Sequence, residues 1–149
     1  MIELKPLFDI EAEVGAPQSL GRSPMGERRC VPILGGIVRG RITGRILSGG
    51  ADWQVLRSDG FTDVDARYQI EAGLEARIEV WSRGLRHAPA GIMERLNRGE
   101  EVAPGAYYFR SAMRFETGAA EFAWLTRVLA VARGIREPER VRLEVFEVA

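Results

Sequence analysis

The sequence predicts an all-β protein, a single antiparallel β-barrel of about eight strands with one short helix near residues 89–98. Three observations favour this fold. Apolar and polar residues alternate with a period of two along most of the chain. Short turn segments rich in Gly and Pro separate the alternating stretches. Glycines also interrupt the apolar face of residues 37–47, which is a usual device for bending a sheet until it closes into a barrel.

The first half of the chain is expected to hold two strands and a loop between them. Residues 1–14 alternate between apolar and charged side chains, as expected of a half-buried strand. Residues 15–27 are rich in Gly, Pro and Ser and predict a loop. Residues 37–47 alternate arginines with small or β-branched residues and predict a sharply bent strand.

The second half begins with the clearest hairpin, formed by residues 62–71 and 75–83, with Gly73 available for the left-handed turn position. A helix is expected at residues 89–98, because Pro89 suits a first helical turn and Gly99 an end. Three more strands follow, at residues 106–116, 124–136 and 140–148.

Composition excludes several classes of function. One domain spanning residues 1–149 is expected, and its 21 basic and 21 acidic residues give no net charge, which argues against a nucleic-acid partner. No apolar run reaches the roughly 18–20 residues that span a bilayer. The lone Cys30 fits a reducing compartment, and the alternating N-terminus does not read as a signal peptide, so we expect a cytoplasmic protein.

Familiar catalytic motifs are absent. The chain has no phosphate-binding loop before a helix, no Ser nucleophile elbow, and neither the CxxC nor the HExxH pattern of a zinc site. Its single histidine, His87, is more simply a surface or loop-packing residue. We therefore expect no metal and no cofactor.

Polar side chains on the predicted strands remain as site candidates. Residues two apart on a strand point the same way, roughly 7 Å apart, so Asp65 shares a face with Arg67, and Tyr108 with Arg110 and Glu116. Turned inward, these faces would line a pocket in which Asp65 or Glu116 moves a proton and the arginines anchor an organic acid. Turned outward, they would be solvated cross-strand ion pairs.

Aromatic residues and one further acid complete the candidate pocket. Trp53, Tyr68 and Trp124 would enclose the apolar part of a ligand, with Asp52 beside them. Trp53 follows Gly49-Gly50, so it is more simply a plug at one end of the barrel, at a corner that includes Asp52.

A set of short motifs runs in order along most of the chain: PILGG at 32–36, GGADW at 49–53, DARY at 65–68, YYFRS at 107–111, FET at 115–117, WL at 124–125 and VARG at 131–134. With these motifs the sequence resembles domain-of-unknown-function family 3237, also called uncharacterised protein family 0311, of bacteria and fungi. The resemblance implies a single-domain, calycin-like (lipocalin-like) barrel and no established activity. Because the polar residues recur as family motifs, the resemblance favours their inward orientation.

Two functions follow from these observations. The first is a barrel that binds a small organic acid and acts on it by acid/base chemistry, as an isomerase, cyclase or hydratase. The second is a non-enzymatic, self-associating scaffold in which the polar cluster is structural. In the scaffold, apolar residues of one parity, Leu125, Leu129 and Val131, would face a second copy. A homodimer is expected in either case.

Overall fold

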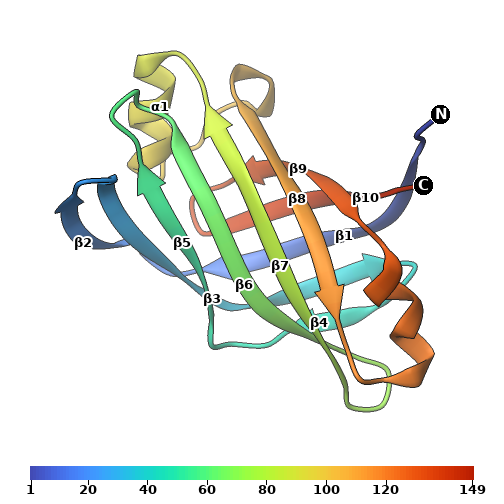
Figure 1. The fold of residues 1–149 in the computed structure, drawn as a ribbon. Helices are drawn as coiled ribbons and strands as arrows, with labels where there is room; N and C mark the ends of the chain where they lie inside the picture. The colour runs from blue at the N-terminus through green and yellow to red at the C-terminus, as the bar shows by residue number, and fades with distance from the viewer.

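Ten strands form one antiparallel sheet that closes on itself in the computed structural model, which describes residues 1–149 (Figure 1). One α-helix and two short 3₁₀ helices, η1 and η2, accompany them. The elements are β1 (Leu4–Val14), β2 (Gln18–Ser23), β3 (Gly26–Gly40), β4 (Gly44–Ile46), β5 (Gly50–Leu56), β6 (Thr62–Ala72), β7 (Ala76–His87), α1 (Ala90–Asn97), η1 (Pro104–Ala106), β8 (Tyr108–Glu116), η2 (Ala120–Arg127), β9 (Ala130–Arg136) and β10 (Arg140–Val148).

The sheet closes through β1, which pairs with β10 on one side and with the second half of β3 on the other. Strands β4 and β5 follow one another in the same place between β3 and β6. The short β2 attaches to the first half of β3. The result is a closed eight-stranded antiparallel barrel with two extra strands, and the predicted fold class is confirmed.

The barrel wall separates alternate side chains, and β8 shows this most regularly. Its nine residues are exposed and buried in strict alternation, beginning with the exposed Tyr108. Because successive side chains of a strand point to opposite faces, every even-numbered residue of β8 faces outward and every odd-numbered one inward.

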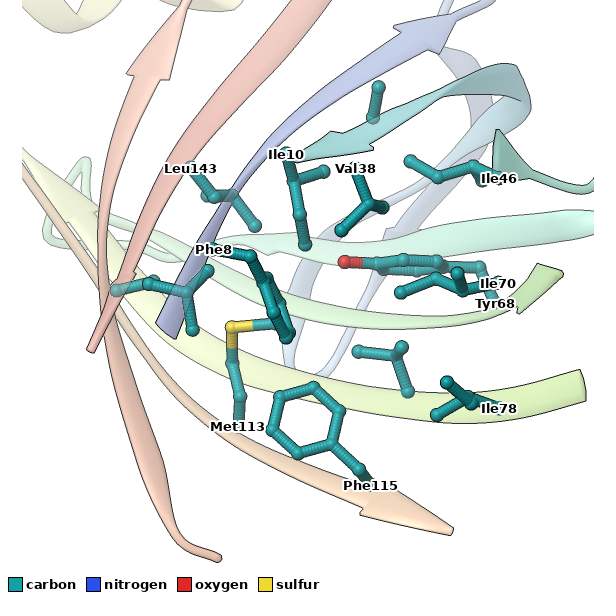
Figure 2. Packing of buried hydrophobic residues seen from close by; sticks show 14 of the residues in the cluster. Phe8, Ile10, Val38, Ile46, Tyr68, Ile70, Ile78, Met113, Phe115 and Leu143 are labelled. Carbon is teal, nitrogen blue, oxygen red and sulfur yellow. The ribbon is translucent and has the colours of Figure 1, made fainter. Parts of the chain in front are cut away.

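The interior contains two apolar clusters. The larger has 22 buried residues drawn from strands around the barrel, among them Phe8, Ile10 and Tyr68 (Figure 2). The smaller lies under α1, which covers one end of the barrel and buries Met93 and Leu96 (Figure 1). The predicted helix is confirmed as α1: Pro89 immediately precedes it, and Gly99 beyond it takes a positive φ of 79°.

Three predicted elements were wrong. Residues 15–27 hold β2 and the start of β3, where the charged run Glu27–Arg29 hid the alternation because Arg29 is itself an inward residue. Residues 37–47 form the end of β3 and all of β4, separated by a turn. Residues 124–127 belong to η2, and the strand predicted at 124–136 begins only at Ala130.

No helix of the structure has both the length and the apolar character needed to cross a membrane.

Candidate functional site

Polar side chains collect inside the barrel between the two apolar clusters. Most of them come from the inward face of a strand and share the parity of buried apolar neighbours. Arg29 follows this rule with Val31 on β3, and Arg86 with Val80 on β7. The inward polar residues discussed below are Arg29, Asp52, Gln54, Thr62, Tyr68, Arg86 and Arg136.

Gln54 connects the carboxylate of this group to one of its guanidinium groups. The Gln54 amide nitrogen donates to Asp52 Oδ2 at 2.8 Å, and its amide oxygen accepts from Arg29 Nη2, also at 2.8 Å. The second oxygen of Asp52 accepts the backbone N–H of Asp65 at 2.8 Å. Asp52 is thereby fixed between β5 and β6 with both oxygens hydrogen-bonded.

Asn97, the last residue of α1, attaches the helix to two of the arginines. Its backbone carbonyl accepts from Arg29 Nη1 at 2.9 Å. Its side-chain oxygen accepts longer contacts of 3.4 Å from Arg86 Nη2 and from the Thr62 hydroxyl. Arg86 is only 1% exposed, and its guanidinium lies 5.6 Å over the ring of Phe109.

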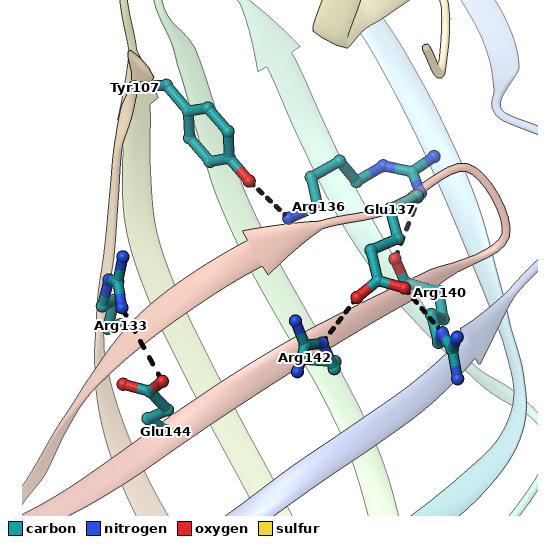
Figure 3. Close-up of polar contacts among 7 residues, drawn as sticks. All are labelled: Tyr107, Arg133, Arg136, Glu137, Arg140, Arg142 and Glu144. Atoms are coloured by element: carbon teal, nitrogen blue, oxygen red, sulfur yellow. Dashed lines mark hydrogen bonds and ion pairs between the residues drawn. The ribbon is translucent and has the colours of Figure 1, made fainter. Parts of the chain in front are cut away.

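Arg136 ends β9 and lies at the same end of the barrel (Figure 3). Its backbone N–H donates to the Tyr107 hydroxyl at 2.9 Å. Its guanidinium donates to the backbone carbonyls of Glu137 and, at 3.4 Å, Arg140 in the β9–β10 turn. Arg136 is 7% exposed, so it is the third buried arginine of the group beside Arg29 and Arg86.

The positive charges of Arg29, Arg86 and Arg136 are not balanced by the nearby negative charge. Burial lowers the pKa of Arg86 to about 10, and the repulsion of Arg136 contributes to the shift. Burial also lowers the pKa of Arg136, with Arg29 adding to the effect, and lowers that of Arg29, which Glu27 and Asp52 partly offset. Burial raises the pKa of Asp52 despite its hydrogen bonds and the attraction of Arg86. The cluster thus carries more buried positive charge than its one carboxylate balances.

A small cavity of about 50 Å³ opens among these residues. One water needs about 10–15 Å³, so the cavity admits a few waters or a group the size of a carboxylate. Tyr68 contributes a phenol whose oxygen is buried without a hydrogen-bond partner (Figure 2). Burial, with the neighbouring charge of Asp52, raises the pKa of this phenol, which therefore stays protonated at neutral pH. The Nε atoms of Arg29 and Arg86 are also buried without partners.

Two glycines permit the close packing that shapes the cavity. A Cβ on Gly50 would lie 2.5 Å from Cβ of Tyr68, so only glycine lets β5 approach β6 there. A Cβ on Gly134 would lie 2.5 Å from the ring of Phe109, the same ring that supports Arg86. These glycines belong to the GGADW and VARG motifs of the sequence.

Of the residues predicted to form a site, Asp52 and Tyr68 lie together at the cavity. The inward orientation predicted for the others on β6 and β8 is wrong. Asp65 and Arg67 are exposed on β6 and face Arg83 at 3.7 Å and Glu79 at 3.1 Å in surface ion pairs. The exposed residues of β8 include three further candidates: Tyr108, Arg110 and Glu116. The physical reason is the larger apolar set of opposite parity on each strand, which takes the interior.

The two tryptophans also lie away from the cavity. Trp53 is 46% exposed, because it alternates with the inward Asp52 and Gln54 on β5 instead of plugging a corner. Trp124 is half-buried in η2, where the guanidinium of Arg41 lies 4.5 Å over its ring. In the same helix Leu125 is fully buried, so its predicted outward position is wrong.

Only Asp52 and Tyr68 of the interior polar residues were predicted, and strand parity signals three of those that were missed. Extending the predicted strand 75–83 by three residues places Arg86 on the face of the buried Val80. Arg136 continues the parity of the buried Ala130 and Ala132. Gln54 shares the parity of Asp52 on a strand that was not predicted. No sequence signal identifies Asn97, whose role depends on where α1 docks.

Comparison with known proteins gives a consistent result along the whole chain. The family described as "Protein of unknown function (DUF3237)" matches residues 2–148. A UPF0311 protein of Bradyrhizobium diazoefficiens is 37% identical over 147 residues, covering 99% of this chain and 97% of its own. A conserved protein of unknown function from Rhodopseudomonas palustris superimposes with a TM-score of 0.94 at 38% identity, covering 100% of this chain and 98% of its own. A protein with unknown function from Clostridium acetobutylicum gives a TM-score of 0.90 at 32% identity, with complete coverage of both chains. This chain belongs to the DUF3237 family, as the resemblance of its motifs implied.

Proposed function

We propose that the barrel binds a small organic acid at its interior arginine cluster and acts on it by acid/base chemistry. One observation carries the proposal: the buried guanidinium groups of Arg86 and Arg136 line the cavity beside the Asp52 carboxylate, and a third buried guanidinium, of Arg29, is linked to that carboxylate through Gln54. Buried charges are costly unless they are paired, so an anion in the cavity supplies the charge that the protein lacks. The unpartnered Nε of Arg86 adds an unused donor.

The chemistry follows from the two titratable groups at the cavity. Asp52 has a raised pKa, which makes its carboxylate a stronger base than an exposed one. Tyr68 remains a neutral phenol and so can donate a hydrogen bond or a proton. With the carboxylate held by arginine, Asp52 would take a proton from the carbon beside a keto group of the same acid, and Tyr68 would donate a hydrogen bond to the enolate oxygen that forms. Isomerases and hydratases share this step.

Binding is tested by NMR titration of the ¹⁵N-labelled protein with acetate, benzoate and pyruvate, using acetamide as the uncharged control. The acids should shift the amides around the cavity, and acetamide should not. Arg86→Met should abolish the response. Arg83→Met is the matched control, because Arg83 lies on the same strand with its side chain 77% exposed. Equal responses to acid and amide would contradict the proposal.

Proton transfer is tested with pyruvate in D₂O. The protein should exchange the methyl protons of pyruvate for deuterium: Asp52 takes one proton from carbon, exchanges it with solvent, and returns a deuteron. Asp52→Asn should stop the exchange, while Asp65→Asn, which alters only an exposed carboxylate, should leave it unchanged. If the protein binds pyruvate without exchanging its methyl protons, acid/base chemistry is contradicted and only ligand binding is supported.

A second candidate function is a self-associating scaffold, and one observation favours it. Asn97 accepts hydrogen bonds from Arg29 and Arg86, so the cluster also holds α1 on the barrel. An apolar outer surface that includes Leu4, Val131 and Phe146 would then bury against a second copy. Light scattering at high protein concentration tests this: a monomer counts against the scaffold, and a dimer disrupted by Val131→Glu supports it.

A further inference from the structure

A surface groove of about 870 Å³ lies directly outside the interior cavity. Leu34 of β3 and three connecting segments line it: the β1–β2 connection with Ala16, the residues after α1 with Arg98, and the β9–β10 turn with Glu139. Two residues, Val14 and Arg136, line both the groove and the cavity. The two spaces are therefore neighbours separated by these side chains.

Val14 and Arg136 form a partition between the groove and the cavity, and Arg136 is its polar residue. Its main chain is fixed, since its N–H donates to the Tyr107 hydroxyl. Its guanidinium is held only by carbonyl oxygens of the adjacent turn, those of Glu137 and Arg140 (Figure 3). No carboxylate forms an ion pair with it, although both Arg140 and Arg142 pair with Glu137. An incoming anion can thus displace the guanidinium from neutral acceptors without breaking an ion pair.

The sizes of the two spaces indicate how a ligand would be divided between them. The cavity of about 50 Å³ holds little more than a carboxylate, while the groove holds a much larger body. The groove also has no excess positive charge of its own: apart from the shared Arg136, it is lined by three acids, Glu13, Glu137 and Glu139, and two arginines, Arg98 and Arg140. The groove therefore favours an uncharged part of a ligand. The cavity, where arginines are in excess, favours the anionic end of the same ligand.

We propose that this groove is the outer half of the ligand site, that Arg136 is the movable partition between the halves, and that the ligand is an elongated organic acid. Its carboxylate lies in the cavity between Arg86 and Arg136, and its uncharged body leaves past Arg136 into the groove. The inference rests on the proposed function, because it uses the same interior cluster as the anchor for the acid.

The test compares acetate, which fits the cavity alone, with hexanoate, which must extend into the groove, by isothermal titration calorimetry. Wild-type protein should bind hexanoate about tenfold more tightly than acetate or better, because each further buried methylene favours binding. Ala16→Trp fills the groove from an exposed position and should remove this advantage, leaving acetate affinity unchanged. Ala120→Trp is the matched control, an exposed alanine in η2 outside the groove.

A second variant, Glu139→Trp, fills the groove from the β9–β10 turn and should act like Ala16→Trp. The inference is overturned if hexanoate binds no more tightly than acetate, or if both groove variants retain the wild-type affinity for hexanoate. In those cases acetate binding still supports the anchor. Failure of wild-type protein to bind either acid overturns the proposed function together with this inference.

Discussion

Asp52 accepts a hydrogen bond of 2.8 Å from the backbone amide of Asp65. The two acids lie on paired strands but on opposite sides of the barrel wall: the Asp52 carboxylate lines the interior cavity, and the Asp65 carboxylate faces Arg83 outside. At Asp65, strand β6 thus contributes only its backbone N–H to the candidate site. Side chains of β6 reach the site from even-numbered positions such as Tyr68.

Replacing Asp52 should change how stability depends on pH. Burial raises the native pKa of Asp52 above the roughly 3.9 of an unfolded chain, so the native state favours the protonated form. The contribution of that proton to stability is complete below about pH 4 and is lost as the pH rises through the native pKa. Relative to Asp52→Asn, wild-type protein should therefore be less stable at pH 7 than at pH 4.

Urea unfolding of both proteins at the two pH values measures this difference. Asp65→Asn is the control, since it removes an exposed carboxylate. The opposite result would be a wild-type protein that becomes more stable relative to Asp52→Asn between pH 4 and pH 7. It would show that the attraction of the arginines lowers the pKa of Asp52 by more than burial raises it.

Loss of the hydroxyl group should affect the stability of the protein differently at Tyr68 and at Tyr107. Tyr68→Phe removes a buried hydroxyl without a partner, so it should leave stability unchanged or raise it by about 1 kcal/mol. Tyr107→Phe leaves the buried N–H of Arg136 without its acceptor and should cost about 1–3 kcal/mol. Chemical denaturation of both variants checks the contrast. Equal destabilisation would indicate that Tyr68 also has a hydrogen-bond partner.

Removing the outward ion pairs should have little effect. The pairs of Asp65 with Arg83 and of Arg67 with Glu79 are solvent-exposed, and such pairs contribute about 0–1 kcal/mol. Arg67→Ala should lower the unfolding free energy by less than about 1 kcal/mol and leave acetate affinity unchanged. A loss of acetate binding in this variant would place the anion on the outer face of β6.

Binding of an acid should weaken at high pH. An anion favours the charged form of Arg86, whose pKa burial lowers to about 10, so affinity should fall as the pH rises through that region. Acetate titrations at pH 7, 9 and 10.5 measure the trend, with circular dichroism confirming that the protein stays folded. Constant affinity across this range would show that Arg86 does not hold the anion.

The fold was predictable because it is specified by alternation, which β6, β7 and β8 display regularly. Alternation also identified the pairs of residues that share a face, such as Asp65 with Arg67. It could not decide which face is inside for a polar pair, since that depends on the apolar residues of the opposite parity around the whole barrel. The prediction chose the wrong face on β6 and β8 for this reason.

Most of the candidate site was less predictable. Arg29 and Gln54 lie on strand segments whose inward faces carry charged and polar groups, so the hydropathy of these segments does not alternate, and neither the start of β3 nor β5 was predicted. Only Asp52 and Tyr68 were identified beforehand. Polar residues on an inward face interrupt the apolar/polar alternation from which an inward face is predicted. The site also depends on closure of the barrel, which brings β3, β5, β7 and β9 together.

The affinity of the protein for acetate, measured by calorimetry at pH 7 in wild-type, Arg86→Met and Arg83→Met proteins, tests the central claim most directly. Wild-type protein and Arg83→Met should bind acetate alike, whereas Arg86→Met should remain folded and not bind acetate. Absence of binding to wild-type protein, or unchanged binding to Arg86→Met, would contradict it.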